Sequence, residues 1–155
     1  MKPLIPILVI LMCVSAVADN SVSGSYQGEN YSFTFSPDFN EISGTWGTLT
    51  YDISVQPDFD EISGQIANSS VDLRMEPDFH DASGSAPCGS IDLAYETDFG
   101  DITGTYCGQS YSQKFDNKNE VQPTFVHLIN DAVLQNFPFP VHMTIREFIR
   151  QRIKF

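Results

Sequence analysis

Residues 41–60 read EISGTWGTLTYDISVQPDFD, and residues 61–80 repeat the pattern as EISGQIANSSVDLRMEPDFH. A unit of this kind, 20 residues long, recurs about five times between Ser21 and Phe115 without an insertion or deletion. A fixed period in this range is typical of repeat proteins, in which each unit buries its apolar face only against its neighbours. The period is marked by Gly24, Gly44, Gly64, Gly84 and Gly104.

Each unit contains two segments in which apolar and polar side chains alternate, as they do along a half-buried β-strand. Residues 42–46 alternate Ile, Gly and Trp with Ser and Thr, and residues 51–55 alternate Tyr, Ile and Val with Asp and Ser. Turn-forming residues such as Pro57 and Asp58 separate the segments. The repeats therefore predict about ten short strands. Because a glycine inside a strand costs stability, we expect a bulky side chain to pack over each repeated glycine.

Two arrangements of these strands fit the pattern. A coiled solenoid would stack equivalent residues about 4.8 Å apart and would place Asp52, Asp72 and Asp92 in one column of like charge. An antiparallel meander would separate them by two strands, about 9 to 10 Å, and its short loops favour hairpins. We therefore predict a mainly β fold, an antiparallel meander or barrel of five 20-residue repeats. An open sheet would also leave edge strands through which two chains could pair as a homodimer.

The chain after the repeats has a helical pattern. Apolar residues recur with helical spacing in residues 124–136 and 144–153, and Pro138 and Pro140 separate the two stretches. We interpret residues 116–155 as two short α-helices that pack on the apolar face of the sheet. The alternative is that the second helix is a cationic amphipathic segment for contact with a membrane or a partner. The residues of that alternative are Arg146, Phe148, Ile149, Arg150 and Arg152.

Residues 1–18 have the three parts of a secretory signal peptide. Lys2 precedes an apolar run from Leu4 to Val14, and the small residues Ala16 and Ala18 mark a cleavage site. We therefore expect a mature protein that begins at Asp19, with residues 19–115 as its repeat domain. It would be secreted or extracellular, or periplasmic if the source is bacterial.

Cleavage there would leave Cys88 and Cys107 as the remaining cysteines. In an oxidising compartment this pair favours one structural disulfide, and it lacks the C-x-x-C spacing of a reactive thiol pair. Asn30 and Asn68 each begin a sequon for N-glycosylation, which matters only in a eukaryotic secretory pathway.

The charge of the chain is distributed unevenly. Residues 19–115 contain 16 acidic and 2 basic residues, a net charge of −14, whereas residues 116–155 contain 4 acidic and 5 basic residues, a net charge of +1. Nucleic acids and anionic lipids carry negative charge too. The acidic repeats therefore argue against nucleic acid as a partner.

The Asp-Phe pair in the longer turn of each repeat is the most regular candidate site. We expect these pairs to lie along one side of the sheet, where they could bind a protein partner or a glycan; the alternative is that each Phe packs beneath its own turn. We expect no metal site or cofactor, although a cluster of carboxylates of this kind would suit Ca²⁺. The candidate binding residues are Asp38, Phe39, Asp58, Phe59, Asp78, Phe79, Asp98 and Phe99.

The segments Ile42-Ser43-Gly44-Thr45-Trp46 and Ile102-Thr103-Gly104-Thr105-Tyr106 resemble the Tyr-x-Gly-x-Trp strand of MORN-type repeats (membrane occupation and recognition nexus). The resemblance covers the repeats alone. It implies hairpins that stack into an elongated antiparallel sheet, in a family that serves mostly as scaffolds or contact platforms. It does not extend to the partners of that family.

The sequence contains no recognisable nucleophile motif, and His80, His127 and His142 have no metal-ligand spacing. We therefore expect a protein that is not an enzyme. The leading hypothesis is a secreted β-repeat protein that acts by surface binding or as a structural module. The alternative is a secreted effector or precursor in which the acidic repeats mask a membrane-active C-terminal helix.

Overall fold

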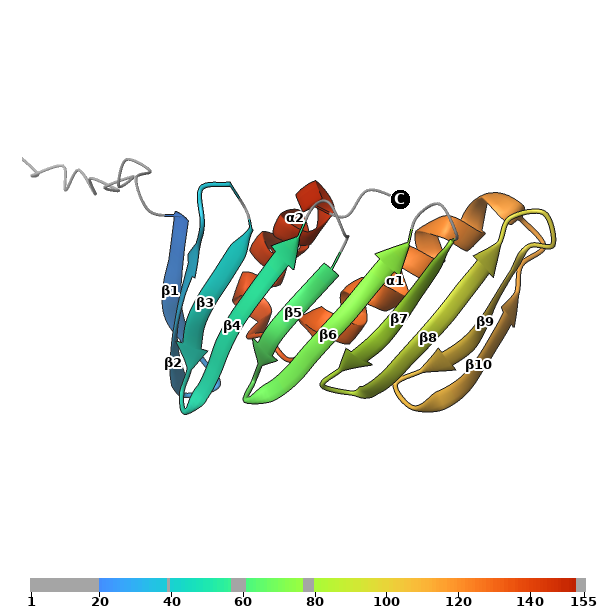
Figure 1. The fold of residues 1–155 in the computed structure, drawn as a ribbon. Coiled ribbons are helices and arrows are strands. Elements are labelled where there is room, and N and C mark those ends of the chain that lie inside the picture. Colours follow the sequence, from blue (N-terminus) through green and yellow to red (C-terminus); the bar gives the residue numbers. More distant parts are fainter. Residues whose placement is uncertain (1–19, 39, 57–60, 77–79, 153–155) are drawn as a thin grey trace, which may run out of the picture.

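The computed structural model describes residues 20–38, 40–56, 61–76 and 80–152, with side chains as far as Glu147. Its strands form one open antiparallel sheet in chain order, with β1 and β10 at the two edges (Figure 1). The predicted meander is confirmed, and the sheet is neither a solenoid nor a closed barrel. The strands are β1 Asn20–Tyr26, β2 Glu29–Phe35, β3 Glu41–Trp46, β4 Leu49–Gln56, β5 Glu61–Ile66, β6 Ser69–Glu76, β7 Asp81–Ala86, β8 Gly89–Glu96, β9 Asp101–Tyr106 and β10 Gln109–Lys114.

Successive repeats are staggered along the strand direction. Asp52 of β4 pairs with Gln65 of β5, and Gln65 pairs with Ser70 of β6 rather than with Asp72. Each repeat is thus displaced by two residues from the one before. Combined with a separation of two strands, this displacement puts equivalent residues about 12 Å apart. Because that distance exceeds the screening length of about 10 Å at 0.1 M salt, Asp52 and Asp72 repel each other only weakly.

Backbone geometry explains most of the repeated glycines. At Gly24 the phenol ring of Tyr31 occupies the space of a Cβ, as the sequence predicts. At Gly84, however, φ is +132°, and a Cβ would collide with the backbone carbonyl oxygen of Asp72 on β6. Gly64 and Gly104 have the same geometry. The prediction of an overlying side chain is wrong for these three glycines, because a carbonyl of the preceding repeat fills the position.

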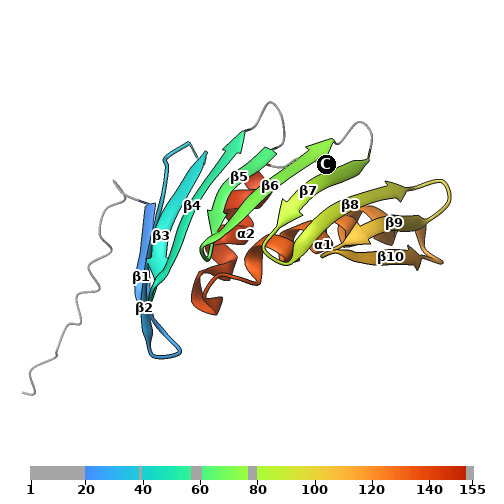
Figure 2. The same cartoon turned by 60° about the horizontal axis from the view of Figure 1, so that its bottom comes forward.

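A layer of helices covers the apolar face of the sheet (Figures 1 and 2). The 3-10 helix η2 (Lys118–Glu120) leads into α1 (Val121–Leu134), which contacts β7, β8 and β9. A second 3-10 helix, η3 (Phe139–Val141), leads into α2 (His142–Arg152), which contacts α1. The helical segment contributes to the core the fully buried side chains of Val121, Phe125, Ile129, Val133, Val141 and Ile145.

An aromatic cluster attaches the connection between the two helices to the first repeats. The ring centroid of Phe137 lies 4.8 Å from that of Tyr51 and 5.6 Å from that of Phe33. The hydroxyl of Tyr51 donates a hydrogen bond of 2.6 Å to the backbone carbonyl oxygen of Asn136. All three rings are buried. The cluster therefore holds the C-terminal segment against β2 and β4.

Tyr51 should make the protein less stable in alkali. Burial raises the pKa of its hydroxyl from 10.0 to about 12. Between pH 10 and 12 the unfolded chain releases this proton and the folded chain keeps it, so stability is complete below pH 10 and falls as the pH rises. We expect Tyr51 to account for a loss of about 1 kcal/mol by pH 11, measured as the difference between wild type and Tyr51→Phe in urea unfolding from pH 8 to 11. Burial also raises the pKa of Tyr95, Tyr106 and Tyr111, so both proteins should lose some stability over this range. The Tyr51→Phe variant should decline less steeply, and equal slopes would contradict this assignment.

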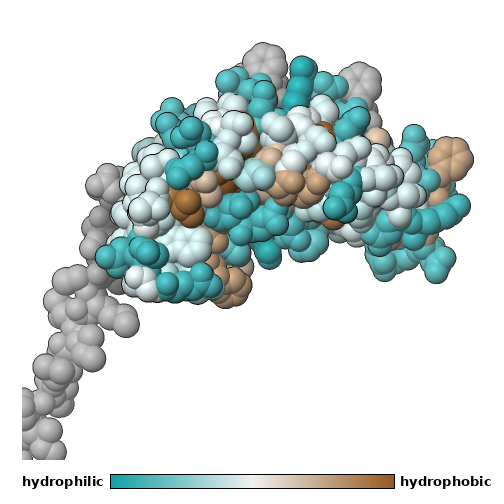
Figure 3. Space-filling view, turned by 90° about the horizontal axis from the view of Figure 1, so that it is seen from below, coloured by the Kyte–Doolittle hydropathy of each residue, from teal (hydrophilic) through white to brown (hydrophobic). Residues whose placement is uncertain are grey.

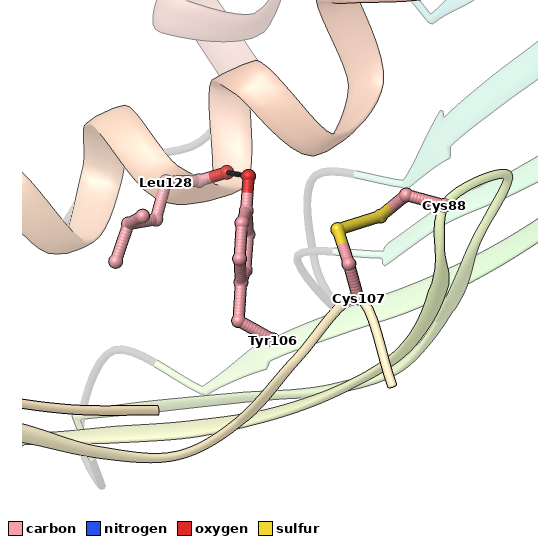
Figure 4. Close-up of a disulfide and its surroundings, with 4 residues drawn as sticks. All are labelled: Cys88, Tyr106, Cys107 and Leu128. Carbon is pink, nitrogen blue, oxygen red and sulfur yellow. Dashed lines mark hydrogen bonds between the residues drawn. A yellow bond between two sulfur atoms is a disulfide. The ribbon is translucent and has the colours of Figure 1, made fainter. Parts of the chain in front are cut away.

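The tips of two neighbouring hairpins are joined covalently. Cys88 and Cys107 form a disulfide with their Cα atoms 4.9 Å apart, so the predicted pair is confirmed (Figure 4). Beside it, the hydroxyl of Tyr106 donates a hydrogen bond of 3.1 Å to the backbone carbonyl oxygen of Leu128, which links β9 to α1. In the middle of the sheet, neighbouring hairpin tips are joined by a hydrogen bond instead of a disulfide. There the backbone N–H of Thr50 donates a hydrogen bond of 2.8 Å to the side-chain oxygen of Asn68.

Removing the disulfide should lower the free energy of unfolding by about 3 kcal/mol, because the bridge closes a loop between cysteines 19 residues apart. Urea unfolding of the oxidised protein and of a Cys88→Ser, Cys107→Ser variant measures the difference. Wild-type protein in reductant is the control and should match the variant. An unchanged midpoint would mean that the hydrogen-bonded turns hold the two tips together without the bridge.

Candidate functional site

The two ends of the sheet, here called the tip end and the loop end, differ in the length of the connections between strands. At the tip end, two-residue turns such as Gln27-Gly28 join the strands of one hairpin. At the loop end, longer connections in residues 36–40, 57–60, 77–80 and 97–100 join one repeat to the next (Figure 1). The candidate Asp-Phe pairs belong to the loop end. Of these connections the structure describes residues 36–38, 40, 80 and 97–100.

Phe99 projects into solvent from the last of these connections. Its side chain is 69% exposed, so packing beneath its own turn, the alternative for these phenylalanines, is wrong here. The backbone around it is held in place. The N–H of Gly100 donates to the carbonyl oxygen of Glu96 at 2.8 Å, and the N–H of Phe115 donates to that of Gly100 at 2.7 Å. The ammonium of Lys118 also donates a hydrogen bond to the backbone carbonyl oxygen of Asp98.

The other candidates are only partly described. Asp38 and Asp98 are exposed at the loop end. The carboxylate of Asp38 accepts a hydrogen bond of 2.6 Å from the side-chain amide of Asn40, so this aspartate also has a role within its turn. The remaining candidates lie outside the described residues: Phe39, Asp58, Phe59, Asp78 and Phe79.

Carboxylates face each other near the loop end. Glu76 of β6 lies opposite Asp81 of β7, and Glu96 of β8 lies opposite Asp101 of β9. The pKa of Asp81 is raised, first by desolvation and then by the nearby charges, although Arg74 lowers it. Like charges in directly opposed positions destabilise a sheet. Arg74 offsets part of this repulsion at the first pair, because its guanidinium lies 2.9 Å from the carboxylate of Glu76.

Within the described part of the chain, no group of three or more His, Cys, Asp or Glu side chains is placed to hold a metal ion. The suggestion of Ca²⁺ stays a prediction, because several of the turn aspartates lie outside that part.

The outer face of the sheet, opposite the helices, is polar. No described helix covers it, and Ser43, Thr45 and Thr103 are exposed on it. Seen from the tip end, the molecular surface is mostly hydrophilic or neutral, with hydrophobic residues in small separate patches (Figure 3). At this end of the molecule, the apolar contacts available to a partner are therefore few.

Sequence reasoning missed a stacked pair at the loop end. The imidazole of His80 lies on the ring of Tyr95, with centroids 4.5 Å apart and planes 14° from parallel. His80 has a left-handed backbone with φ of +57°. A signal for this conformation exists in the repeat, because the equivalent residues are Asn40, Asp60 and Gly100, types that favour a positive φ.

η3 and the start of α2 present apolar side chains to solvent. Phe139 is 68% and Met143 71% exposed, and Arg146 beyond them is exposed, whereas Val141 and Ile145 are buried. Among the described residues, neither helix is long and apolar enough to cross a membrane. Four residues of the alternative membrane or partner helix belong to α2 but have side chains outside the description: Phe148, Ile149, Arg150 and Arg152.

A comparison of the chain with protein-family models, with curated proteins and with solved structures finds no match. The resemblance of the repeats to the MORN type therefore stays a prediction.

Proposed function

We propose that this protein is a secreted, non-catalytic binding module that contacts its partner through the loop end. The observation that carries the proposal is the exposure of Phe99 on a backbone held by hydrogen bonds. An aromatic side chain presented in this way supplies contact area while losing little conformational entropy on binding. Aromatic residues also dominate the energetic centres of protein interfaces.

The surroundings of Phe99 indicate the chemistry of the partner. Glu96, Asp98 and Asp101 flank the ring in the sequence, and the described loop end is acidic. A matching surface would have an apolar pocket bordered by Lys or Arg, which favours a protein over a glycan. The repeat would present Phe39, Phe59 and Phe79 in equivalent turns, so several weak contacts could add to one strong attachment.

The test compares wild type with Phe99→Ala and with Thr97→Ala, an exposed position in the same connection. The three oxidised proteins are screened against displayed extracellular proteins and against a glycan array. We expect Thr97→Ala to keep the affinity of wild type and Phe99→Ala to lose it by about tenfold or more. All three should melt alike, because Phe99 buries little area. A partner that binds equally well after alanine replacement of all four turn phenylalanines would refute the site.

The exposed Phe139 and Met143 support a second candidate, a membrane-active C-terminal helix. Val141 and Ile145 would have to leave the core for α2 to lie on a bilayer, so this function requires release of the segment. A synthetic peptide of residues 141–155 tests it on vesicles of phosphatidylserine and phosphatidylcholine. Helix formation and dye leakage are expected if the candidate is right. A peptide that neither folds nor permeabilises these vesicles contradicts it.

A further inference from the structure

Both end strands of the sheet leave one side without a partner. In the described chain β1 pairs only with β2, and β10 only with β9. The residues that flank a two-residue hairpin turn exchange both of their hydrogen bonds, so every second residue directs its backbone N–H and C=O groups outward. On β1 these residues are Ser21, Ser23 and Ser25, and on β10 they are Ser110, Ser112 and Lys114.

These end strands lack the usual protection against pairing. Natural edge strands are blunted by charged residues, proline or bulges. β1 has the sequence NSVSGSY and pairs with β2 along all of its 7 residues without a bulge. β10 has the sequence QSYSQK, with its only charge at its last residue, Lys114. The acidic side chains that could repel another sheet lie mainly on the strands between them.

The repeat itself supplies a complementary partner for each edge. Inside the chain, the second strand of each repeat pairs with the first strand of the next, and β2 with β3 is one example. β10 is the second strand of the last repeat, and β1 is the first strand of the first. A second copy would therefore extend the sheet by the same pairing that joins its own repeats.

The internal register can be transferred to this contact. In β2 and β3, Tyr31 lies opposite Trp46 and Phe33 opposite Gly44. With the same register at the contact, Tyr111 would face Tyr26 of the next copy, and Gln113 would face its Gly24. The carbonyl oxygen of Ser112 would then lie beside Gly24 of the next copy. This is the position that the carbonyl oxygen of Asp52 takes beside Gly64 within the chain. The side chains of Tyr26, Tyr111 and Val22, now half-buried at the ends, would gain cover.

From this match we propose that copies of the chain associate head to tail, with β10 of one copy beside β1 of the next. This contact does not depend on binding at the loop end. It would place the loop ends of successive copies in one row along a continuous sheet. Because the two surfaces differ, the contact propagates or closes into a ring, and it does not stop at a symmetric dimer. The full chain has a net charge of −12 and residues 19–155 have −13, which opposes association, so added salt should strengthen it.

The test uses the oxidised chain from Asp19, its expected mature form, in analytical ultracentrifugation across protein and salt concentration. Ser23→Pro blocks β1 and Ser112→Pro blocks β10, in each case at an N–H that faces away from the sheet. We expect the average mass of wild type to rise with concentration and with salt. Each proline variant alone should be monomeric. An equimolar mixture should form dimers and stop there, because it contains one usable β10 and one usable β1.

Two outcomes would overturn the proposal. One is a wild-type protein that stays monomeric at every concentration and salt. The other is self-association of Ser23→Pro alone, which would indicate symmetric pairing of two β10 strands. If proline prevents folding, charged substitutions at Ser112 and Ser25 test the same register, because Ser112 would face Ser25 of the next copy. A chain carrying Ser25→Lys and Ser112→Asp should associate roughly fivefold more tightly than one carrying Asp at both positions. Equal association of the two chains would refute the head-to-tail register.

Discussion

Replacing Gly84 with alanine should lower the free energy of unfolding by about 3 to 5 kcal/mol. An L side chain at a φ of +132° costs about 1 to 3 kcal/mol, and the added Cβ would also collide with the carbonyl oxygen of Asp72. The sheet could remove the collision only by separating β6 from β7, which would disturb the hydrogen bonds between those repeats. Urea unfolding of the oxidised variant measures the loss.

Two control variants separate the causes of this effect. Gly28→Ala has a positive φ of +82° but no atom within 4 Å of the added Cβ, so it should cost only about 1 to 2 kcal/mol. Ser83→Ala, an exposed position beside Gly84 on β7, should change stability by less than about 0.5 kcal/mol. If Gly84→Ala costs no more than Gly28→Ala, the close approach of the two repeats is not needed for the fold.

Replacing Phe137 with alanine should cost about 3 to 5 kcal/mol, because it leaves a cavity between the rings of Phe33 and Tyr51. The matched control is Phe139→Ala, in the same segment and 68% exposed, which should change stability by less than about 0.5 kcal/mol. Thermal melting and urea unfolding of both variants decide the outcome. Equal, small effects would mean that the C-terminal segment is not anchored, and the membrane-active alternative would then become the better hypothesis.

The strands and hairpins of this fold could be predicted because their signals are local. The alternation in β6, where Val71, Leu73 and Met75 are buried between exposed neighbours, can be recognised in any short window of the sequence. The cysteine pair was predictable too, because removal of the expected signal peptide leaves Cys88 and Cys107 as the remaining cysteines. At the candidate site, sequence reasoning identified Phe99 but could not decide whether it was packed or exposed. The backbone of this connection is held by hydrogen bonds from Phe115 to Gly100 and from Lys118 to Asp98, and Lys118 lies beyond the repeats, so the repeat pattern does not include it.

The repeat period, the turn chemistry and the period-of-two alternation by themselves determined that this chain is a series of β-hairpins followed by two helices. Those features depend on neighbours within one unit. Only the tertiary structure decided that the sheet stays open, that successive repeats are staggered, and that carbonyl groups occupy the space beside the later glycines. It also decided how the helical segment is attached, through the hydrogen bond between Tyr51 and Asn136, 85 residues apart. These properties depend on register and packing between distant segments, whose free energies arise only when the whole sheet and its helices have come together.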